Sequence, residues 1–348
     1  MRDTSIRASL FLLLLGCGHG EHGSGPPSST PIPAVNEDAV YVVSGGDSAV
    51  VVLGVGGERI GAIALANAMY PHHLSLSADR ARLLVAVPGV DLSGGHAGGH
   101  AGHEGAVLLL EAATGRTLAA RTLPASNHNA IFSPDGSEVW TSQMGTPGTV
   151  LVLDPATLAT RSTLTVGAEP SEVTFSRDGR YAFVADGGSS EVTVIDVASK
   201  ETVKTIGVGA GPVGAWPGLD GVMYVDCETA RTIVAIDGAT LATLRTINLG
   251  NLGFTPGMAA TPPGLGELWV SDADNGRVVV FQAASGAKLG EIPTAAGAHG
   301  IAFSGDGKTA WVSNQGAGSV TIVDVAAHAA TKTVAAGSKP NGILFRAR

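Results

Sequence analysis

Residues 169–211 read EPSEVTFSRDGRYAFVADGGSSEVTVIDVASKETVKTIGVGAG, and this stretch decides the fold. Four short runs rich in Val, Thr, Ile, Tyr and Phe alternate with turn residues, a pattern that predicts four strands joined by tight turns. Between the first two runs lies Arg177-Asp178-Gly179, where the glycine supplies the positive φ that a hairpin turn needs. The predicted strands are residues 172–176, 181–185, 191–196 and 202–208.

The closing phrase of the first predicted strand recurs seven times along the chain. The seven phrases end at Ser77, Ser133, Ser176, Gly218, Pro262, Ser304 and Arg346. The intervals between them are 56, 43, 42, 44, 42 and 42 residues. A period in the low forties with strand content is the sequence signature of a β-propeller. We therefore predict an all-β, seven-bladed propeller with four antiparallel strands in each blade.

The two ends of the repeating region complement each other. Residues 38–65 supply only three predicted strands, and NGILF at residues 341–345 supplies the first strand that this set lacks. A blade built from both ends of the chain locks the ring and hides the sheet edges that an open propeller would expose. We expect residues 341–345 to pair beside residues 41–43 in one sheet.

The interior of the predicted blades is apolar. The third strand of each repeat is almost continuous Val, Leu and Ile, as expected for sheets that are covered on both faces. Trp140, Trp269 and Trp311 recur in the second strand. We interpret these three tryptophans, together with Trp216, as packing between blades rather than as platforms on which a ligand stacks.

Several phrases carry a family resemblance. SPDG at 133–136, GRYAFVADGGSSEVTVIDVASK at 179–200 and TIGVGAGPVG at 205–214 resemble the YVTN-type repeat of seven-bladed bacterial propellers. The resemblance covers the chain from about residue 38 onward. It implies the architecture strongly and the function weakly, because members and structural relatives include surface-layer proteins, ligand-binding proteins, lactonases, lyases and cofactor-bearing dehydrogenase subunits.

The amino-terminal segment resembles a bacterial lipoprotein signal. The apolar run at residues 10–15 is too short to span a bilayer and ends in Leu-Leu-Gly-Cys at residues 14–17. We therefore expect residues 1–16 to be cleaved and Cys17 to be lipidated. An ordinary secretory signal with an incidental cysteine is the alternative. Because Gly18 rather than Asp follows the cysteine, we expect an outer-membrane anchor that faces the periplasm or the exterior.

Composition limits the remaining possibilities. Residues 17–37 are rich in Gly, Ser and Pro and are predicted to be a flexible tether, which leaves residues 38–348 for the propeller. The net charge is −9 and no Lys/Arg cluster appears, so we expect no nucleic-acid partner. The sequence has no Cys-x-x-Cys-His motif and no P-loop, so we expect neither covalent haem nor a nucleotide. Lipidation of Cys17 would leave Cys227 alone, without a disulfide partner.

Candidate site residues gather at one mouth of the predicted channel, on the face where the chain enters the first strand of each blade. We call this face the top face. The residue five positions before each phrase end falls there, and these residues are His72, His128, Ser171, Val213, Gly257, His299 and Asn341. The next position contributes His73, Asn129 and Glu172, among others. The three histidines at one repeat position lie on one arc of the ring with Asn341 and Glu172.

Converging imidazoles beside a carboxylate are typical of Zn²⁺ or Cu²⁺ sites. We therefore predict that His72, His128 and His299 bind a metal ion. The predicted ligand-binding residues beside them are His73, Asn129, Glu172 and Asn341. The alternative is that histidines at the channel mouth only form hydrogen bonds to the backbone and to water.

The one long repeat interval contains a histidine-rich insertion. Residues 91–104 read DLSGGHAGGHAGHE and connect the second and third strands of the His72 blade, so the loop returns to the top face. We predict that His96, His100 and His103 form a metal-capturing flap that becomes ordered when a metal binds. A solvated, low-complexity loop is the alternative.

Three functions fit these features, and we predict the first, with no enzymatic activity expected. It is a lipid-anchored binding protein whose top face takes up a transition metal or a metal-dependent ligand. The second is a YVTN-like hydrolase or lyase, in which His72, His128 and His299 act as metal ligands or general acid/base groups and Glu172 assists. The third is an adhesion or scaffolding propeller with a protein partner. Because the sequence has no Gly-x-Ser-x-Gly elbow, no serine is marked as a nucleophile.

Overall fold

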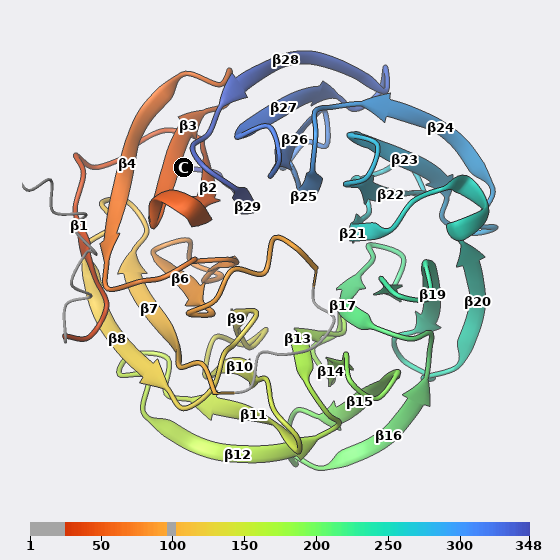
Figure 1. Ribbon diagram of the computed structural model, residues 1–348, viewed down its shortest axis with the longest axis horizontal. Coiled ribbons are helices and arrows are strands. Elements are labelled where there is room, and N and C mark those ends of the chain that lie inside the picture. Colours follow the sequence, from red (N-terminus) through yellow and green to blue (C-terminus); the bar gives the residue numbers. More distant parts are fainter. Residues whose placement is uncertain (1–24, 96–101) are drawn as a thin grey trace, which may run out of the picture.

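The computed structural model describes residues 25–95 and 102–348 as seven β-sheets arranged in a ring around a central axis (Figure 1). Within each sheet the strands are antiparallel, and the first strand of each repeat lies nearest the axis while the fourth lies at the rim. The structure confirms the predicted seven-bladed propeller.

Six blades are formed by consecutive strands, which are numbered here from the axis outward. Blade 1 contains β5 (Leu74–Leu76), β6 (Arg82–Val87), β7 (Gly105–Glu111) and β8 (Thr117–Leu123). Blade 2 contains β9 (Ala130–Phe132), β10 (Val139–Gln143), β11 (Gly148–Leu153) and β12 (Thr160–Val166). Blade 3 contains β13 (Pro170–Phe175), β14 (Tyr181–Asp186), β15 (Glu191–Asp196) and β16 (Thr202–Gly207).

The next three blades follow the same order. Blade 4 contains β17 (Pro212–Pro217), β18 (Val222–Cys227), β19 (Thr232–Asp237) and β20 (Thr243–Asn248). Blade 5 contains β21 (Pro256–Ala260), β22 (Glu267–Asp272), β23 (Arg277–Gln282) and β24 (Lys288–Pro293). Blade 6 contains β25 (Ala298–Phe303), β26 (Thr309–Asn314), β27 (Ser319–Asp324) and β28 (Ala329–Ala335). Short 3-10 helical turns occupy Gly45–Asp47 and Gly250–Leu252.

Blade 7 closes the ring with strands from both ends of the chain. Its order from the axis is β29 (Pro340–Arg346), β2 (Ala39–Ser44), β3 (Ala49–Gly54), β4 (Arg59–Ala66) and β1 (Ser28–Thr30). Tyr41 lies opposite Leu344, and Val42 lies opposite Ile343, in an antiparallel ladder. This register confirms the predicted pairing of residues 341–345 with residues 41–43.

Part of the segment that the sequence assigns to the tether is a fifth strand of blade 7. β1 pairs with β4, with Ser29 opposite Leu65. The side chain of Ile32 lies over Gly61, where an added Cβ would come 3.2 Å from Ile32 Cδ1, and Val35 is buried. The prediction of a flexible tether over residues 17–37 therefore differs from the structure at residues 28–35, because two apolar side chains give this segment something to bury.

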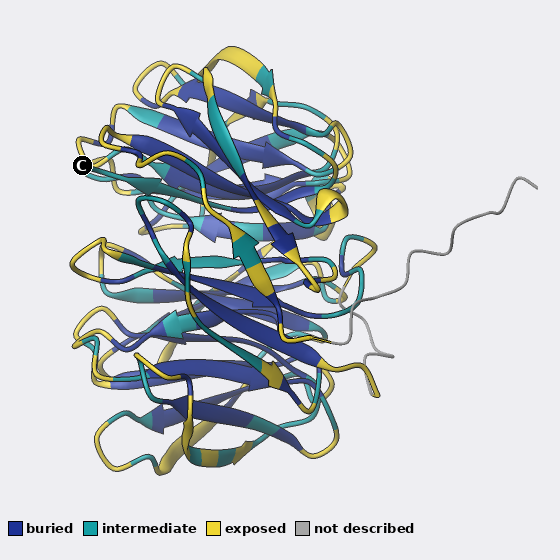
Figure 2. Cartoon of the chain, turned by 90° about the vertical axis from the view of Figure 1, so that its left-hand side faces the viewer, coloured by how far each residue is buried: buried dark blue, intermediate teal, exposed yellow. Residues whose placement is uncertain are grey.

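Tryptophans from the second strand join neighbouring blades. Trp140, Trp269 and Trp311 are at most 1% exposed. Each lies against a phenylalanine in the first strand of the next blade, with ring centroids 5.2–5.4 Å apart, in the pairs Trp140–Phe175, Trp269–Phe303 and Trp311–Phe345. Figure 2 shows the consequence, with buried inner strands and exposed outer strands and loops. For these three tryptophans the structure agrees with the interpretation of blade packing.

The predicted signal peptide and Cys17 lie outside the described residues. Among residues 25–95 and 102–348, no helix has the length and apolar character needed to cross a bilayer.

Candidate functional site

Backbone bulges at the axis direct the candidate side chains into a shared space. In β13, the register with β14 shifts between Pro170 and Val173, and in β25 a similar shift lies between Ala298 and Ile301. A bulge places extra residues on one strand and re-aims their side chains. These two bulges contain Glu172 and His299. His72 and His73 precede β5 in irregular backbone, so the alternation of side chains along a strand does not separate them.

Four imidazoles gather at the axis as a result. The ring centroid of His128 lies 4.5 Å from that of His72 and 4.8 Å from that of His73. His299 is farther away, with its centroid 6.1 Å from His72 and 6.2 Å from His73. His72, His128 and His299 are buried, whereas His73 is partly exposed. We call His72, His73, His128 and His299 the imidazole cluster.

Glu172 and Asn341 hold the cluster from outside. Glu172 Oε1 lies 2.9 Å from His128 Nδ1 and 3.0 Å from His73 Nε2. Asn341 Nδ2 lies 2.7 Å from His72 Nδ1. Asn341 comes from the closing strand β29, which approaches blade 1 closely at Gly342. An added Cβ on Gly342 would come 2.6 Å from the carbonyl oxygen of His72, so there is no space for a side chain there. Ring closure therefore also completes the site.

The contacts assign the protons within the cluster. A carboxylate only accepts hydrogen bonds, so the nitrogens that face Glu172, His128 Nδ1 and His73 Nε2, carry the protons. The Nε2 atoms of His72 and His128 are 3.1 Å apart. If His72 Nδ1 accepts from the Asn341 amide, the Nε2–H of His72 donates this hydrogen bond and His128 Nε2 accepts it. The result is a chain of close polar contacts from Asn341 through His72 and His128 to Glu172.

Three of the imidazoles are close enough to share an ion. One ligand nitrogen from each of His72, His73 and His128 lies within 4.8 Å of the other two. The set therefore differs from the predicted one, since His73 takes the place of His299. The tandem His72-His73 immediately before a strand was the available signal. His73 was instead predicted to be a ligand-binding residue beside the metal site, because only the histidines that share one repeat position were chosen as metal ligands.

Trp216 differs from the other tryptophans because it faces a cavity beside the cluster. Its indole Nε1 donates to Asp226 Oδ1 over 2.6 Å. An added Cβ on Gly214 would lie 2.5 Å from the indole, so this position requires glycine. Asp226 is fully buried, and burial, followed by the charges of Glu228 and Glu172, raises the pKa of its carboxyl group well above the usual value. Asp226 thus fixes the orientation of the Trp216 indole through this hydrogen bond.

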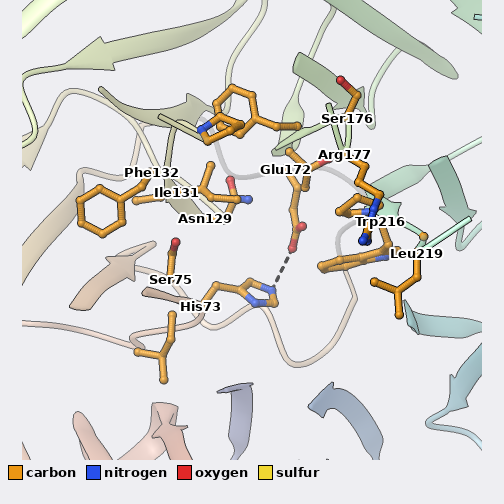
Figure 3. A pocket seen from close by; sticks show the side chains of 17 residues that line it. His73, Ser75, Asn129, Ile131, Phe132, Glu172, Ser176, Arg177, Trp216 and Leu219 are labelled. Carbon is orange, nitrogen blue, oxygen red and sulfur yellow. Dashed lines mark ion pairs between the residues drawn. The ribbon is translucent and has the colours of Figure 1, made fainter. Parts of the chain in front are cut away.

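The imidazole cluster separates two cavities along the axis. The lower cavity, of about 470 Å³, has His73, Asn129 and Glu172 at its inner end and reaches Arg177 and Leu219 on the face opposite the top face (Figure 3). The upper cavity, of about 390 Å³, lies among the top-face loops and is lined by residues that include His299, Glu228, Asp274 and Gly95.

The other predicted site residues have different positions. Both ends of the Asn129 amide bond to the backbone of Val173, at 2.8 and 3.2 Å, so this side chain ties blade 2 to blade 3. His103 is exposed and lines a separate cavity, whereas His96 and His100 lie outside the described residues. Cys227 is buried, and desolvation raises the pKa of its thiol to about 12.

No protein-family model matches this chain, and neither does any curated protein sequence. Solved structures with the same fold include the periplasmic gluconolactonase PpgL of Pseudomonas aeruginosa, with 20% identity and a TM-score of 0.72 over 89% of this chain and 99% of that one. A candidate 6-phosphogluconolactonase from Bacteroides uniformis has 17% identity and a TM-score of 0.72 over 90% of this chain and 100% of that one. The dihydro-heme d1 dehydrogenase NirN has 15% identity and a TM-score of 0.63 over 91% of this chain and 79% of that one.

Likeness at these identities shows the fold, a seven-bladed propeller similar to the gluconolactonase propellers. It also corrects one inference from the sequence. Two of these three structures are named as lactonases, so the interpretation as a binding protein without catalytic activity gives way to the hydrolase alternative.

Proposed function

We propose that this protein is a metal-assisted hydrolase that opens a lactone or ester at the imidazole cluster. The observation that carries the proposal is the way in which Glu172 and Asn341 hold the outer nitrogens of three histidines. In the metal-bound state that we propose, His72 Nε2, His128 Nε2 and His73 Nδ1 would be the nitrogens that bind the shared ion. Three histidines with one open position are a ligand set of catalytic zinc sites.

The residues present fit such an ion. The separation of 3.1 Å between His72 Nε2 and His128 Nε2 is close to the value of about 3.3 Å expected for two nitrogens on a tetrahedral Zn²⁺. A carboxylate that bonds to the outer nitrogen of a ligating histidine fixes the ring and raises its basicity. Glu172 stands in that relation to His73 and His128. The fit extends to Cu²⁺, which imidazole also suits.

Asn341 supplies a second test of the fit. Its Oδ1 is buried without a hydrogen-bond partner, while its Nδ2 faces His72 Nδ1. An imidazole that binds a metal through Nε2 carries its proton on Nδ1 and needs an acceptor there. A rotation of the Asn341 amide by about 180° would place Oδ1 opposite His72 Nδ1. The Nδ1–H of His72 could then donate to Oδ1, which would give both atoms a hydrogen-bond partner.

The chemistry of the reaction follows from the position of His73. When bound, the ion would supply a Lewis acid and a water molecule of lowered pKa. His73 lines the lower cavity beside Glu172, so a substrate carbonyl reaches the cluster from that side. In hydrolysis, the water oxygen bonds to the carbonyl carbon and the acyl C–O bond breaks. The proton that the attacking water gives up ends on the leaving alkoxide oxygen, which gives a hydroxy acid from a lactone or an acid and an alcohol from an ester.

The family resemblance and the amino-terminal segment support this assignment and its location. The YVTN-type repeat is found in propellers that include lactonases, and one similar structure is named a periplasmic enzyme. We propose that this chain also acts in the periplasm or at the cell exterior, anchored to the outer membrane through Cys17.

The hydrolase proposal predicts a metal-dependent activity. Mature protein prepared without a histidine tag is expected to contain about one equivalent of zinc or copper by elemental analysis. It is also expected to hydrolyse members of a panel of lactones and aryl esters. Treatment with a chelator should abolish turnover, and the metal should restore it. Turnover that is unchanged in metal-free protein would contradict the metal, and the absence of turnover on every member would contradict the hydrolase.

The anchor proposal predicts a change in localisation. Cys17→Ser is expected to move the protein from the membrane fraction to the soluble fraction, because the lipid is the only attachment proposed. Cys227→Ser is the matched control, since that cysteine is buried inside blade 4 and should leave fractionation unchanged. Membrane association of the Cys17 variant would show that another region holds the bilayer.

A further inference from the structure

We infer that the substrate carries an apolar chain that occupies the lower cavity, and that a polyhydroxylated sugar lactone is a poor substrate. This inference rests on the proposed hydrolase function and specifies its substrate class. The proposed substrate therefore differs from the sugar lactones after which two of the similar structures are named.

The wall of the lower cavity is largely apolar. Ile131, Phe132, Phe175, Trp216 and Leu219 contribute to it, and Figure 3 shows Ile131 and Phe132 on one side of Glu172 and Trp216 and Leu219 on the other. A volume of about 470 Å³ lies in the usual range for sites that take small molecules. Leu219 is 45% exposed at the outer mouth. The cavity thus joins a polar, reactive inner end to an apolar passage.

Three of the polar side chains in this wall already form hydrogen bonds within the protein. Thr174 Oγ1 donates to the carbonyl oxygen of Ala215, and Ser176 Oγ donates to Asp178 Oδ1 over 2.6 Å. The Asn129 amide uses both its donor and its acceptor on the Val173 backbone. Among the hydroxyl groups that line the described part of the cavity, only that of Ser75 has no hydrogen bond of this kind.

These two features discriminate between substrates. Each sugar hydroxyl that loses water without gaining a partner is expected to weaken binding about tenfold. Each methylene buried against the apolar wall is expected to strengthen binding about fourfold. A lactone or ester with an alkyl chain therefore gains from the lower cavity, whereas gluconolactone loses.

The test measures kcat/KM for γ-butyrolactone, γ-hexalactone, γ-octalactone and δ-gluconolactone. The value is expected to rise about fourfold for each added methylene until the cavity is filled, with δ-gluconolactone at least about 100-fold below γ-octalactone. A value for δ-gluconolactone equal to or above that for γ-octalactone would overturn the inference while leaving the hydrolase intact.

A pair of variants tests the position of the chain. Leu219→Asn is expected to lower kcat/KM for γ-octalactone about fivefold more than that for γ-butyrolactone. Leu265→Asn is the matched control, because Leu265 is 43% exposed and does not line the cavity. Equal effects of the two variants would contradict a chain in the lower cavity.

A binding measurement keeps this inference separate from the hydrolase proposal. Octanamide and gluconamide are neutral, carry the same amide head and differ in their chains. Isothermal titration is expected to give at least tenfold tighter binding of octanamide, and Leu219→Asn should weaken it. If octanamide binds more tightly but no substrate is hydrolysed, the hydrolase proposal is rejected and the site for an apolar ligand is kept. Equal or weaker binding of octanamide would overturn the inference whatever the activity.

Discussion

His128→Ala is expected to lower kcat/KM for lactone or ester hydrolysis by roughly 10²–10⁴-fold, the range for loss of a positioned catalytic group. His128 is 1% exposed and connects the two halves of the site, with one ring nitrogen facing His72 and the other facing Glu172. Alanine removes a proposed metal ligand. It also removes one of the two imidazoles that contact the Glu172 carboxylate, and only the contact with His73 remains. Metal content and kcat/KM should therefore fall together.

A matched histidine elsewhere in the chain provides the control. His328 also bonds to a carboxylate, with Nε2 3.0 Å from Glu267 Oε2, but it lies beside Trp269 and away from the axis. His328→Ala is expected to keep metal content and to change kcat/KM less than twofold. Thermal melting of both variants separates loss of the site from loss of the fold. A folded His128 variant with near-normal kcat/KM would exclude the imidazole cluster as the catalytic centre.

Removal of residues 340–348 is expected to destabilise the propeller by on the order of 5 kcal/mol, comparable with the whole stability of a typical domain. The deletion exposes one edge of β2 and removes the ladder that includes Tyr41 opposite Leu344. It also removes Phe345 from its stacked contact with Trp311, at 5.4 Å. Several lost backbone hydrogen bonds and three partly buried apolar side chains account for the estimate.

Urea unfolding followed by circular dichroism measures this effect. The truncated chain is expected to unfold at much lower urea or to lose its cooperative transition. A synthetic peptide with the sequence of residues 338–348 should restore part of the stability, because it can refill the vacant position beside β2. Deletion of residues 347–348 alone is the control and should change stability little, since β29 ends at Arg346. Equal stability of the two truncated chains would contradict closure by β29.

The fold was predictable because its determinants are local and repeated. Four of the blades carry the same Asp-Gly turn, every blade has the same apolar third strand, and the repeat period counts the blades. Closure could be deduced as well, since three strands at one end require a fourth from the other. The sequence did not predict strand β1. The two apolar residues that follow it, Ile32 and Val35, are isolated in a segment whose composition is otherwise that of a linker.

The site was predictable as a region and only partly as a set of contacts. Repeat alignment placed His72, His128 and His299 at one mouth of the channel. The choice of His73 rather than His299 as the third close imidazole depends on backbone irregularity before β5, which no periodic pattern reveals. Trp216 was assigned to blade packing with the other tryptophans. Its different environment follows from Gly214 and Asp226, which lie near it only in the folded chain.

The sequence by itself determined the number of blades, the strand order and the elements that meet at the axis, because these depend on residue periodicity and turn chemistry. The tertiary structure alone decided which side chains touch. Bulges rotate individual residues out of strand alternation, and ring closure brings Asn341 to His72 across 269 positions of sequence. The same packing commits Asn129, Thr174 and Ser176 of the lower cavity to internal hydrogen bonds and places apolar side chains over much of its wall. Contacts of this kind arise from the relative placement of separate blades, which is set by the packing of the whole ring rather than by any one repeat.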